Sequence, residues 1–231
     1  MILGLPGAGL ALAAYILTDN LSTAMIILGI TVGMVFVAHP DMRPFIAVAA
    51  AGVILIVIGV LFLVATTKNS DSFRVMRVLV WLQPEKYSDE GGYQTLQALY
   101  AIGSGGLFGR GLGNSIQKLG SVPEAQNDMI FSIICEELGI FGGIFVLILF
   151  GYLLYRLFFI AQNAPDLFGS LLVSGVFIHI ALQVILNIAV VVNLMPNTGV
   201  TLPFISYGGT SIMFLMAEMG LALSVSRQIK F

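Results

Sequence analysis

The chain has 231 residues, of which 58% are hydrophobic and only 10% are charged, with a formal net charge of -2. Soluble domains carry about 25% charged residues, so this composition excludes an ordinary soluble protein and predicts a polytopic membrane protein. It also excludes the basic footprint of a nucleic-acid-binding protein. The only cysteine, Cys135, can form neither a disulfide framework nor a thiolate metal cluster.

Apolar runs long enough to cross about 30 Å of hydrocarbon recur along the chain. We expect an all-α membrane helix bundle of about six transmembrane helices, which makes residues 1–231 a single membrane domain. Met1 leads into apolar sequence without a basic region, which argues against a secretory signal peptide. The expected spans lie at about 1–17, 21–38, 45–66, 129–158, 168–195 and 209–226.

The distribution of basic residues predicts the orientation, because cytoplasmic loops carry an excess of Lys and Arg. The connections at 19–20 and 196–207 contain neither, which places them outside together with the long segment 67–127. The C-terminus is then cytoplasmic. Aromatic and aliphatic residues in the long segment predict structure rather than disorder. The basic residues at the alternate helix ends are Arg43, Arg156, Arg227 and Lys230.

Within this external loop, residues 94–102 are typical of a short amphipathic helix, and residues 103–113 form a glycine-rich turn. The turn is similar to a phosphate-cradling loop, and Arg110 and Lys118 would neutralise a diphosphate through charge-assisted hydrogen bonds. It lacks the Gly-Lys-Ser/Thr ending of a nucleotide P-loop. An ordinary glycine-rich connector without a ligand is the equal alternative.

A polar segment then leads into the next expected span. Asp128 and Glu136 are eight residues apart, so on one helix they would share a face, with Asp128 at the external rim and Glu136 about two turns deeper. A glutamate at that depth indicates a polar interior or pathway. The alternative for Asp128 is a helix N-cap or a first-turn acid.

Polar groups also occur in the last two spans. His179, Gln183 and Asn187 form a stripe on one helix, for which an interhelical hydrogen bond is favoured over a metal site. Glu218 is predicted either to pair inside the bundle or to take part in catalysis. Between these spans, the Gly-, Pro- and Ser-rich stretch 197–211 predicts the wall of a polar cavity at one membrane face. The alternative is an ordinary turn.

Several motifs in this order resemble the SEDS family, whose members FtsW, RodA and SpoVE serve bacterial shape, elongation, division and sporulation. The resemblance covers nearly the whole chain but corresponds to the last six or so of about ten family helices. Asp19-Asn-Leu-Ser-Thr23 departs from the usual motif, with Asn20 at an aspartate position. The motifs are Gln97 to Gly113, Gln117-Lys118, Pro123-Glu124 with Asp128, Glu136-Glu-Leu-Gly139, Asn187-Ile188 and Thr201-Leu-Pro-Phe-Ile-Ser-Tyr-Gly-Gly-Thr-Ser211.

The resemblance implies a peptidoglycan glycosyltransferase that polymerises lipid II at the outer face of the bacterial cytoplasmic membrane, with a class B penicillin-binding protein as partner transpeptidase. Asp128 stands at the position of the family's essential external-loop aspartate and would be the general base. Arg110 and Lys118 would bind the diphosphate, with or without a divalent cation such as Mg²⁺ or Mn²⁺, and Glu124 would assist. The cavity wall for the lipid head group would be formed by Ser206, Tyr207, Gly208 and Gly209.

Two functions from other classes stay open. A lipid II flippase, or another transporter of lipid-linked substrates, would also place polar residues in broken helices, and it would depend on Glu136, His179 and Glu218. A non-catalytic scaffold for the division machinery would tolerate Asp128→Asn. A polymerase would instead depend first on Asp128.

Overall fold

The computed structural model describes residues 4–18, 20–39, 73–119 and 122–229, and within these ranges the regular structure is entirely helical, without a strand. The predicted all-α class is therefore confirmed. The expected span at 45–66 lies outside the described residues, so the count of about six spans stays a prediction. The helices are α1 (Gly4–Thr18), α2 (Leu21–Ala38), α4 (Phe73–Leu82), α5 (Gly92–Gly105), α6 (Ile130–Asn163), α7 (Leu167–Val191) and α8 (Gly209–Ser226), with short 3₁₀ turns η1 (Ser88–Glu90) and η2 (Gln117–Leu119).

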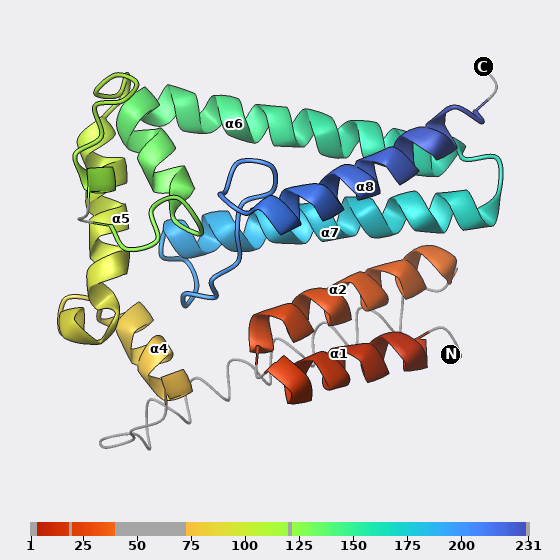
Figure 1. The fold of residues 1–231 in the computed structure, drawn as a ribbon, viewed down its shortest axis with the longest axis horizontal. Coiled ribbons are helices and arrows are strands. Elements are labelled where there is room, and N and C mark those ends of the chain that lie inside the picture. Colours follow the sequence, from red (N-terminus) through yellow and green to blue (C-terminus); the bar gives the residue numbers. More distant parts are fainter. Residues whose placement is uncertain (1–3, 19, 40–72, 120–121, 230–231) are drawn as a thin grey trace.

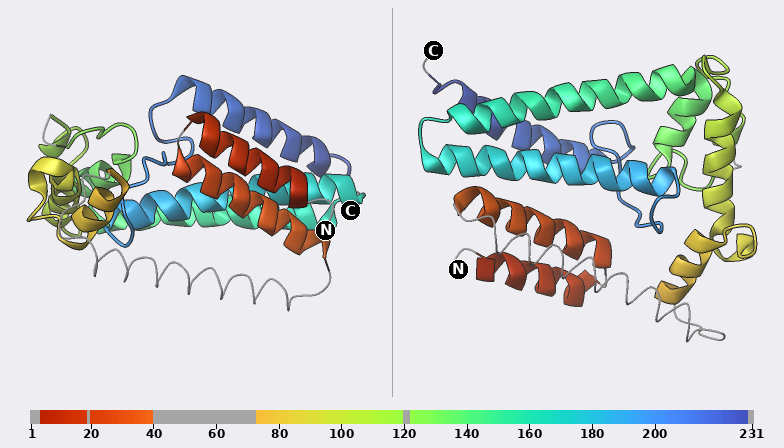
Figure 2. Two further views of the ribbon diagram at one scale, coloured as in Figure 1. Left: turned by 90° about the horizontal axis from the view of Figure 1, so that it is seen from below. Right: turned by 180° about the vertical axis from the view of Figure 1, so that it is seen from behind.

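The described helices form two regions. The long helices α6, α7 and α8 lie side by side with α1 and α2, and their axes run in nearly the same direction (Figures 1 and 2). At one end of this bundle, α4, α5 and their loops form a second region, which we call the outer layer. Helix α5 runs across the ends of the long helices (Figure 1). The predicted amphipathic helix at 94–102 is thus confirmed as part of α5.

Helices α6, α7 and α8 are each long and apolar enough to cross a membrane, while α1 and α2 are shorter apolar helices. Large apolar side chains point outward on the bundle, such as Phe145 at 60% and Phe214 at 65% exposure. In water this surface would be unfavourable by about 25 cal/mol per Å², whereas hydrocarbon chains solvate it. We conclude that the chain is a multi-pass membrane protein.

Small residues bring α2 and α7 together. A Cβ atom at Gly29 would lie 2.7 Å from a methyl of Leu182, and one at Gly33 would lie 2.6 Å from a methyl of Ile178. Such close approach is the usual way that membrane helices gain packing energy, because lipid tails are as apolar as leucine. Replacing either glycine would force the facing methyl group to move.

Helix α6 is broken at Gly139, where φ is 70° and ψ is -171°. Figure 1 shows a short first arm, residues 130–138, set at an angle to the long second arm. Backbone groups of the glycine-rich turn satisfy the break, since the amide of Ile140 donates to the carbonyl of Gly106 at 2.9 Å. A Cβ at Gly139 would lie 2.3 Å from the carbonyl oxygen of Leu107, so only glycine fits.

This break corrects two predictions. The run at 129–158 is not one continuous helix, because α6 is kinked at Gly139. Asp128 and Glu136 do not share one helix face either. Helix α6 begins at Ile130, so Asp128 precedes it rather than sharing its face. The glycine-rich turn also begins later than predicted, since residues 103–105 are the last turn of α5.

Candidate active site

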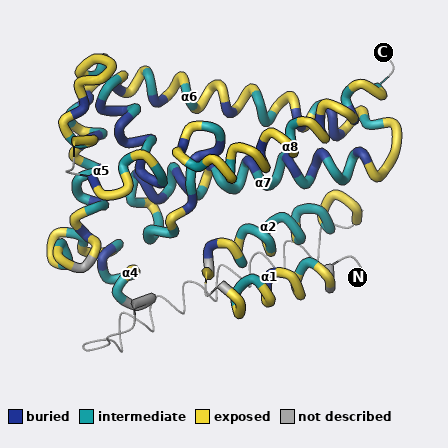
Figure 3. Tube along the Cα trace, viewed as in Figure 1, coloured by how far each residue is buried: buried dark blue, intermediate teal, exposed yellow. Residues whose placement is uncertain are grey.

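Asp128 lies in the turn before α6, where the outer layer meets the bundle. Its side chain is only 7% exposed, and its Oδ1 has no hydrogen-bond partner among the described residues. The N-cap of α6 is Met129, and no side chain caps that end, so the helix-cap alternative for Asp128 is wrong. Buried segments gather in this region (Figure 3). The sequence predicted that Asp128 lies at the external rim. In the structure its carboxylate is covered instead.

The surroundings of Asp128 favour its protonated form. Burial raises the pKa of the Asp128 carboxyl above its ordinary value, because the charged form loses hydration, and the nearby charge of Glu124 adds to the rise. The backbone amide of Asp128 and the side-chain amides of Gln94 and Asn197 oppose it by stabilising the charged form. A carboxylate with a raised pKa is a stronger base than an exposed aspartate.

Two amide side chains bridge the outer layer to the loop between α7 and α8, close to Asp128. Asn197 Nδ2 donates to Gln94 Oε1 at 3.2 Å, and Gln94 Nε2 donates to the carbonyl of Pro123 at 3.4 Å. Asn197 Oδ1 accepts the backbone amide of Gly199 at 2.9 Å. Sequence reasoning missed both as site residues, because they are 103 positions apart and the patterns that contain them, 94–102 and 197–211, do not indicate this contact.

Asn187 holds the backbone of Asp128 in place from α7. Its Nδ2 donates to the carbonyl of Asp128 at 2.6 Å and to that of Val200 at 2.8 Å, and the residue is fully buried. One side chain therefore ties the candidate base, α7 and the loop after α7 together. The predicted polar stripe of α7 thus serves hydrogen bonding at its Asn187 end.

The loop 192–208 returns toward the segment before α6. Ser206 Oγ donates to the carbonyl of Asn127 at 2.6 Å, and the amide of Tyr207 donates to that of Gln126 at 2.8 Å. Ser206 is buried and braces the loop, whereas the ring of Tyr207 is 73% exposed. Gly208 and Gly209 mark the start of α8. These four predicted residues therefore lie beside the Asp128 turn, with Ser206 engaged by backbone groups.

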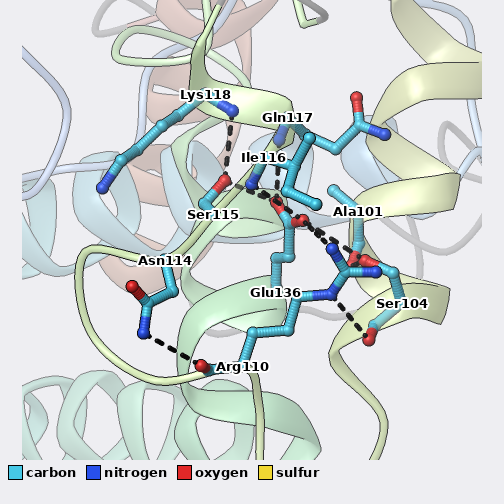
Figure 4. Close-up of polar contacts among 9 residues, drawn as sticks. All are labelled: Ala101, Ser104, Arg110, Asn114, Ser115, Ile116, Gln117, Lys118 and Glu136. Atoms are coloured by element: carbon cyan, nitrogen blue, oxygen red, sulfur yellow. Dashed lines mark hydrogen bonds and ion pairs between the residues drawn. The ribbon is translucent and has the colours of Figure 1, made fainter.

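The predicted diphosphate ligands already have acidic partners. Arg110 Nη1 lies 3.6 Å from Glu136 Oε1, and Lys118 Nζ lies 2.6 Å from Glu137 Oε1. Both cations keep about a third of their side-chain surface exposed, 37% for Arg110 and 34% for Lys118. Figure 4 shows the Lys118 side chain extending away from the Glu136 carboxylate. A role in binding diphosphate stays a prediction.

The Glu136 carboxylate, on the first arm of α6, binds the segment that follows the glycine-rich turn. Its side chain is completely buried, and Ser115 Oγ donates to Oε2 at 2.5 Å. The backbone amides of Ile116 and Gln117 donate to the same carboxylate at 3.2 and 3.3 Å (Figure 4). A buried carboxylate with several donors is a stable arrangement, and it shapes the loop that carries Arg110 and Lys118.

A cavity of about 550 Å³ opens next to this loop. Lys118 and Glu124 contribute charged groups to its lining, and Glu124 has the unusual φ of 52°. Asp128 is not part of the lining. Of the predicted site residues, Lys118 and Glu124 line this cavity, whereas Asp128, Arg110 and residues 206–209 do not. The remaining lining residues are Leu119, Val122, Ala125, Gln126, Ile130 and Ile133.

His179 and Glu218 form an interhelical pair between α7 and α8. His179 Nδ1 lies 3.0 Å from both carboxylate oxygens of Glu218. The predicted interhelical role of His179 is therefore confirmed, and so is the pairing role that was one of the two predictions for Glu218. Over the ranges that the structure describes, no three His, Cys, Asp or Glu side chains are placed to hold a metal ion. A divalent cation at the diphosphate stays a prediction.

Several known proteins are similar to this chain in sequence. Stage V sporulation protein E of Bacillus subtilis is 40% identical over 229 residues, covering 98% of this chain and 60% of that protein. A probable peptidoglycan glycosyltransferase FtsW of the same organism is 42% identical over 184 residues, covering 80% of this chain and 46% of the relative. The chain therefore spans about half the length of the curated relatives it matches.

Solved structures are also similar to this chain. A chain from a peptidoglycan synthase complex, described by its structural coordination of polymerization and crosslinking, matches with a TM-score of 0.72 and 30% identity over 98% of this chain and 60% of that chain. The rod shape determining protein RodA of Thermus thermophilus matches with a TM-score of 0.58 and 29% identity, covering 100% of this chain and 56% of RodA. The family model FTSW_RODA_SPOVE, described as cell cycle protein, matches residues 2–230. The chain belongs to the FtsW/RodA/SpoVE family.

Proposed function

We propose that the protein to which this chain belongs is a peptidoglycan glycosyltransferase that polymerises lipid II, with Asp128 as its general base. The observation that carries the proposal is the covered Asp128 carboxylate. Its Oδ1 has no hydrogen-bond partner among the residues that the structure describes, and burial raises its pKa. Relatives named as probable peptidoglycan glycosyltransferases support the reaction class. Such a base supplies about 10² to 10⁴ in rate, or roughly 3 to 5 kcal/mol.

The reaction joins two sugars and releases a lipid diphosphate. Asp128 takes the proton of the acceptor hydroxyl, whose oxygen then forms a bond to the anomeric carbon of the donor sugar. The bond between that carbon and the diphosphate oxygen breaks, and the diphosphate leaves with its negative charge. Lys118 at the cavity and Arg110 on the glycine-rich turn would stabilise that charge by exchanging a carboxylate partner for the phosphate.

The neighbouring groups complete the site. Glu124 and Gln126 at the cavity would hydrogen bond to sugar hydroxyls, and the exposed Tyr207 ring would pack on a sugar face. Ser206 would keep the wall in place through its bond to Asn127, while Gly208 and Gly209 leave room beside it. The polyprenyl tail would remain among the apolar helix faces, because transferring it to water is strongly unfavourable.

The same proposal assigns a location and a partner. We place the protein in the bacterial cytoplasmic membrane with the outer layer facing outside, where it would serve division, elongation or sporulation. A class B penicillin-binding protein would crosslink the new strands. The structural match to a chain of a peptidoglycan synthase complex supports a partnership of this kind.

The test uses the full-length protein, purified together with its partner and supplied with labelled lipid II. We expect glycan strands from the unmodified protein and a loss of about 10² to 10⁴ in rate for Asp128→Asn, which keeps the shape of the side chain but cannot accept the proton. Asp166→Asn, at the opposite end of the bundle, is the matched control and should polymerise normally. Strand synthesis that survives Asp128→Asn unchanged contradicts the proposal.

A flippase or other transporter is the competing function. The side chains on which it would depend already have protein partners, since His179 pairs with Glu218 and Glu136 binds the glycine-rich turn. A transporter would make no strands in the purified assay and would instead move labelled lipid II between the leaflets of a vesicle. A scaffold would do neither.

A further inference from the structure

We propose that the apolar tip of the glycine-rich turn enters the edge of the lipid bilayer beside α6. The tip consists of Leu107, Phe108 and Leu112, whose side chains are 57%, 80% and 76% exposed. Its partner is the hydrocarbon of membrane lipids, so the turn would be a membrane contact in addition to the spanning helices. The proposal goes beyond the glycosyltransferase function and does not depend on it.

The tip continues the lipid-facing surface of α6. The ring of Phe108 packs on the ring of Phe141, with centroids 5.4 Å apart. Phe141 begins a stripe of apolar side chains at helical spacing along the second arm of α6, so the stripe lies on one face of that arm. Phe108 therefore extends an apolar surface that hydrocarbon already covers. The stripe consists of Phe141, Ile144, Phe145 and Ile148, which are 57%, 46%, 60% and 61% exposed.

The length of the second arm places this contact near the edge of the hydrocarbon. At about 1.5 Å per residue, residues 140–163 extend about 36 Å, whereas the hydrocarbon core is about 30 Å thick. The excess length falls at the ends of the arm. Phe141 is the second residue of the arm, so it lies close to the boundary between hydrocarbon and head groups. Phe108, which packs on it, lies at the same level.

The backbone of the turn is suited to this place, because polar groups near hydrocarbon need partners within the protein. Backbone hydrogen bonds join the turn to α6 on both sides of its break. They satisfy donors and acceptors of the turn and hold the tip against the helix. The bonds, donor first, are Arg110 to Glu136 (3.0 Å), Gly111 to Glu137 (2.9 Å), Ile140 to Gly106 (2.9 Å) and Phe141 to Leu107 (3.3 Å).

The charge of the turn is held on the protein side. Arg110 is the only charged residue between positions 103 and 117. Its Nε donates to the carbonyl of Ser104 at 3.4 Å, and its Nη1 lies 3.6 Å from Glu136 Oε1 (Figure 4). A protein partner would be expected to meet a polar rim with hydrogen-bonding groups, whereas lipid hydrocarbon needs only apolar surface. The tip thus fits lipid better than a protein partner.

The experiment measures the surroundings of position 108 in the full-length protein, reconstituted in lipid bilayer discs. Phe108→Cys carries a nitroxide spin label, in a background from which Cys135 and any other cysteine have been removed. Power saturation then compares collisions of the label with oxygen, which concentrates in hydrocarbon, and with a water-soluble nickel chelate. We expect oxygen to relax the label severalfold more effectively than the nickel chelate does.

Two reference positions calibrate this reading. Phe145→Cys, on the stripe of α6, is the hydrocarbon reference, and Asp89→Cys, on the exposed turn η1, is the water reference. Leu112→Cys repeats the measurement without disturbing the contact between Phe108 and Phe141. A label at position 108 or 112 that matches the water reference overturns the proposal. A label shielded from both agents overturns it as well, because protein rather than lipid then covers the tip.

Discussion

The outer layer and the helix bundle differ in the hydrogen-bond partners of their polar side chains. In the bundle, polar side chains are few, and a pair such as His179 and Glu218 is closed within itself. In the outer layer, side chains reach backbone groups of distant segments, as Trp81 does at the carbonyl of Asn193 and Gln94 at that of Pro123. The difference shows that specific hydrogen bonds hold the loops at this end in place, as they do in helices. Fixed loops of this kind would suit a site for charged substrates.

The largest effect on this comparison is expected from removing the Glu136 carboxylate. Glu136→Ala leaves the Ser115 hydroxyl and the amides of Ile116 and Gln117 without their acceptor. We expect a loss of about 3 to 5 kcal/mol of stability, measured as a lower thermal unfolding midpoint in detergent. The adjacent Glu137→Ala, whose side chain is partly exposed, should cost much less. Equal losses would show that the turn does not depend on Glu136.

The next largest effect should follow from Asn187→Leu. This change deprives the buried carbonyls of Asp128 and Val200 of their donor, at about 1 to 3 kcal/mol for each. Hydrogen exchange should therefore increase in the loop after α7 and in the turn around Asp128, while the middle of α6 stays protected. Gln183→Leu, one turn earlier on α7, is the control, and exchange that rises equally in both variants would contradict the anchoring role.

A smaller effect is expected at the exposed ion pair. Lys118→Met removes the partner of Glu137, but both groups are partly solvated, so stability should change by only about 0 to 1 kcal/mol. Under the proposed function, the same change should weaken substrate binding and raise KM severalfold. A large loss of stability would make Lys118 a structural residue, and an unchanged KM would remove it from the site.

The pH dependence of stability gives the most delicate test. The folded-state pKa of Asp128 is raised, so the native protein binds its proton more tightly than the unfolded chain does. Stability should therefore be greatest below the unfolded pKa and should decline as pH rises through the folded pKa. Asp128→Asn should remove this decline. Unfolding midpoints that fall equally steeply with pH in both proteins would show that the carboxylate is not the cause.

Much of the helical framework could be predicted from apolar run length. The expected spans at 21–38 and 209–226 coincide with α2 and α8, because membrane helices need continuous hydrocarbon-compatible surface and little else. The span predicted to run to residue 195 ends at Val191, since the chain then turns and binds Trp81 of α4 through Asn193. The length of the apolar run alone does not predict that contact.

The composition and motifs of the chain were enough to indicate a membrane helix bundle, the family and the place of Asp128 along the sequence, since these depend on solvent and on local pattern. Three features depended on the folded chain: the break at Gly139, the engagement of Glu136 by the glycine-rich turn, and the Gln94–Asn197 pair beside Asp128. Each joins segments distant in sequence, and the first two do so at backbone N–H and C=O groups. Every residue carries such groups, so no residue pattern reveals which of them will meet.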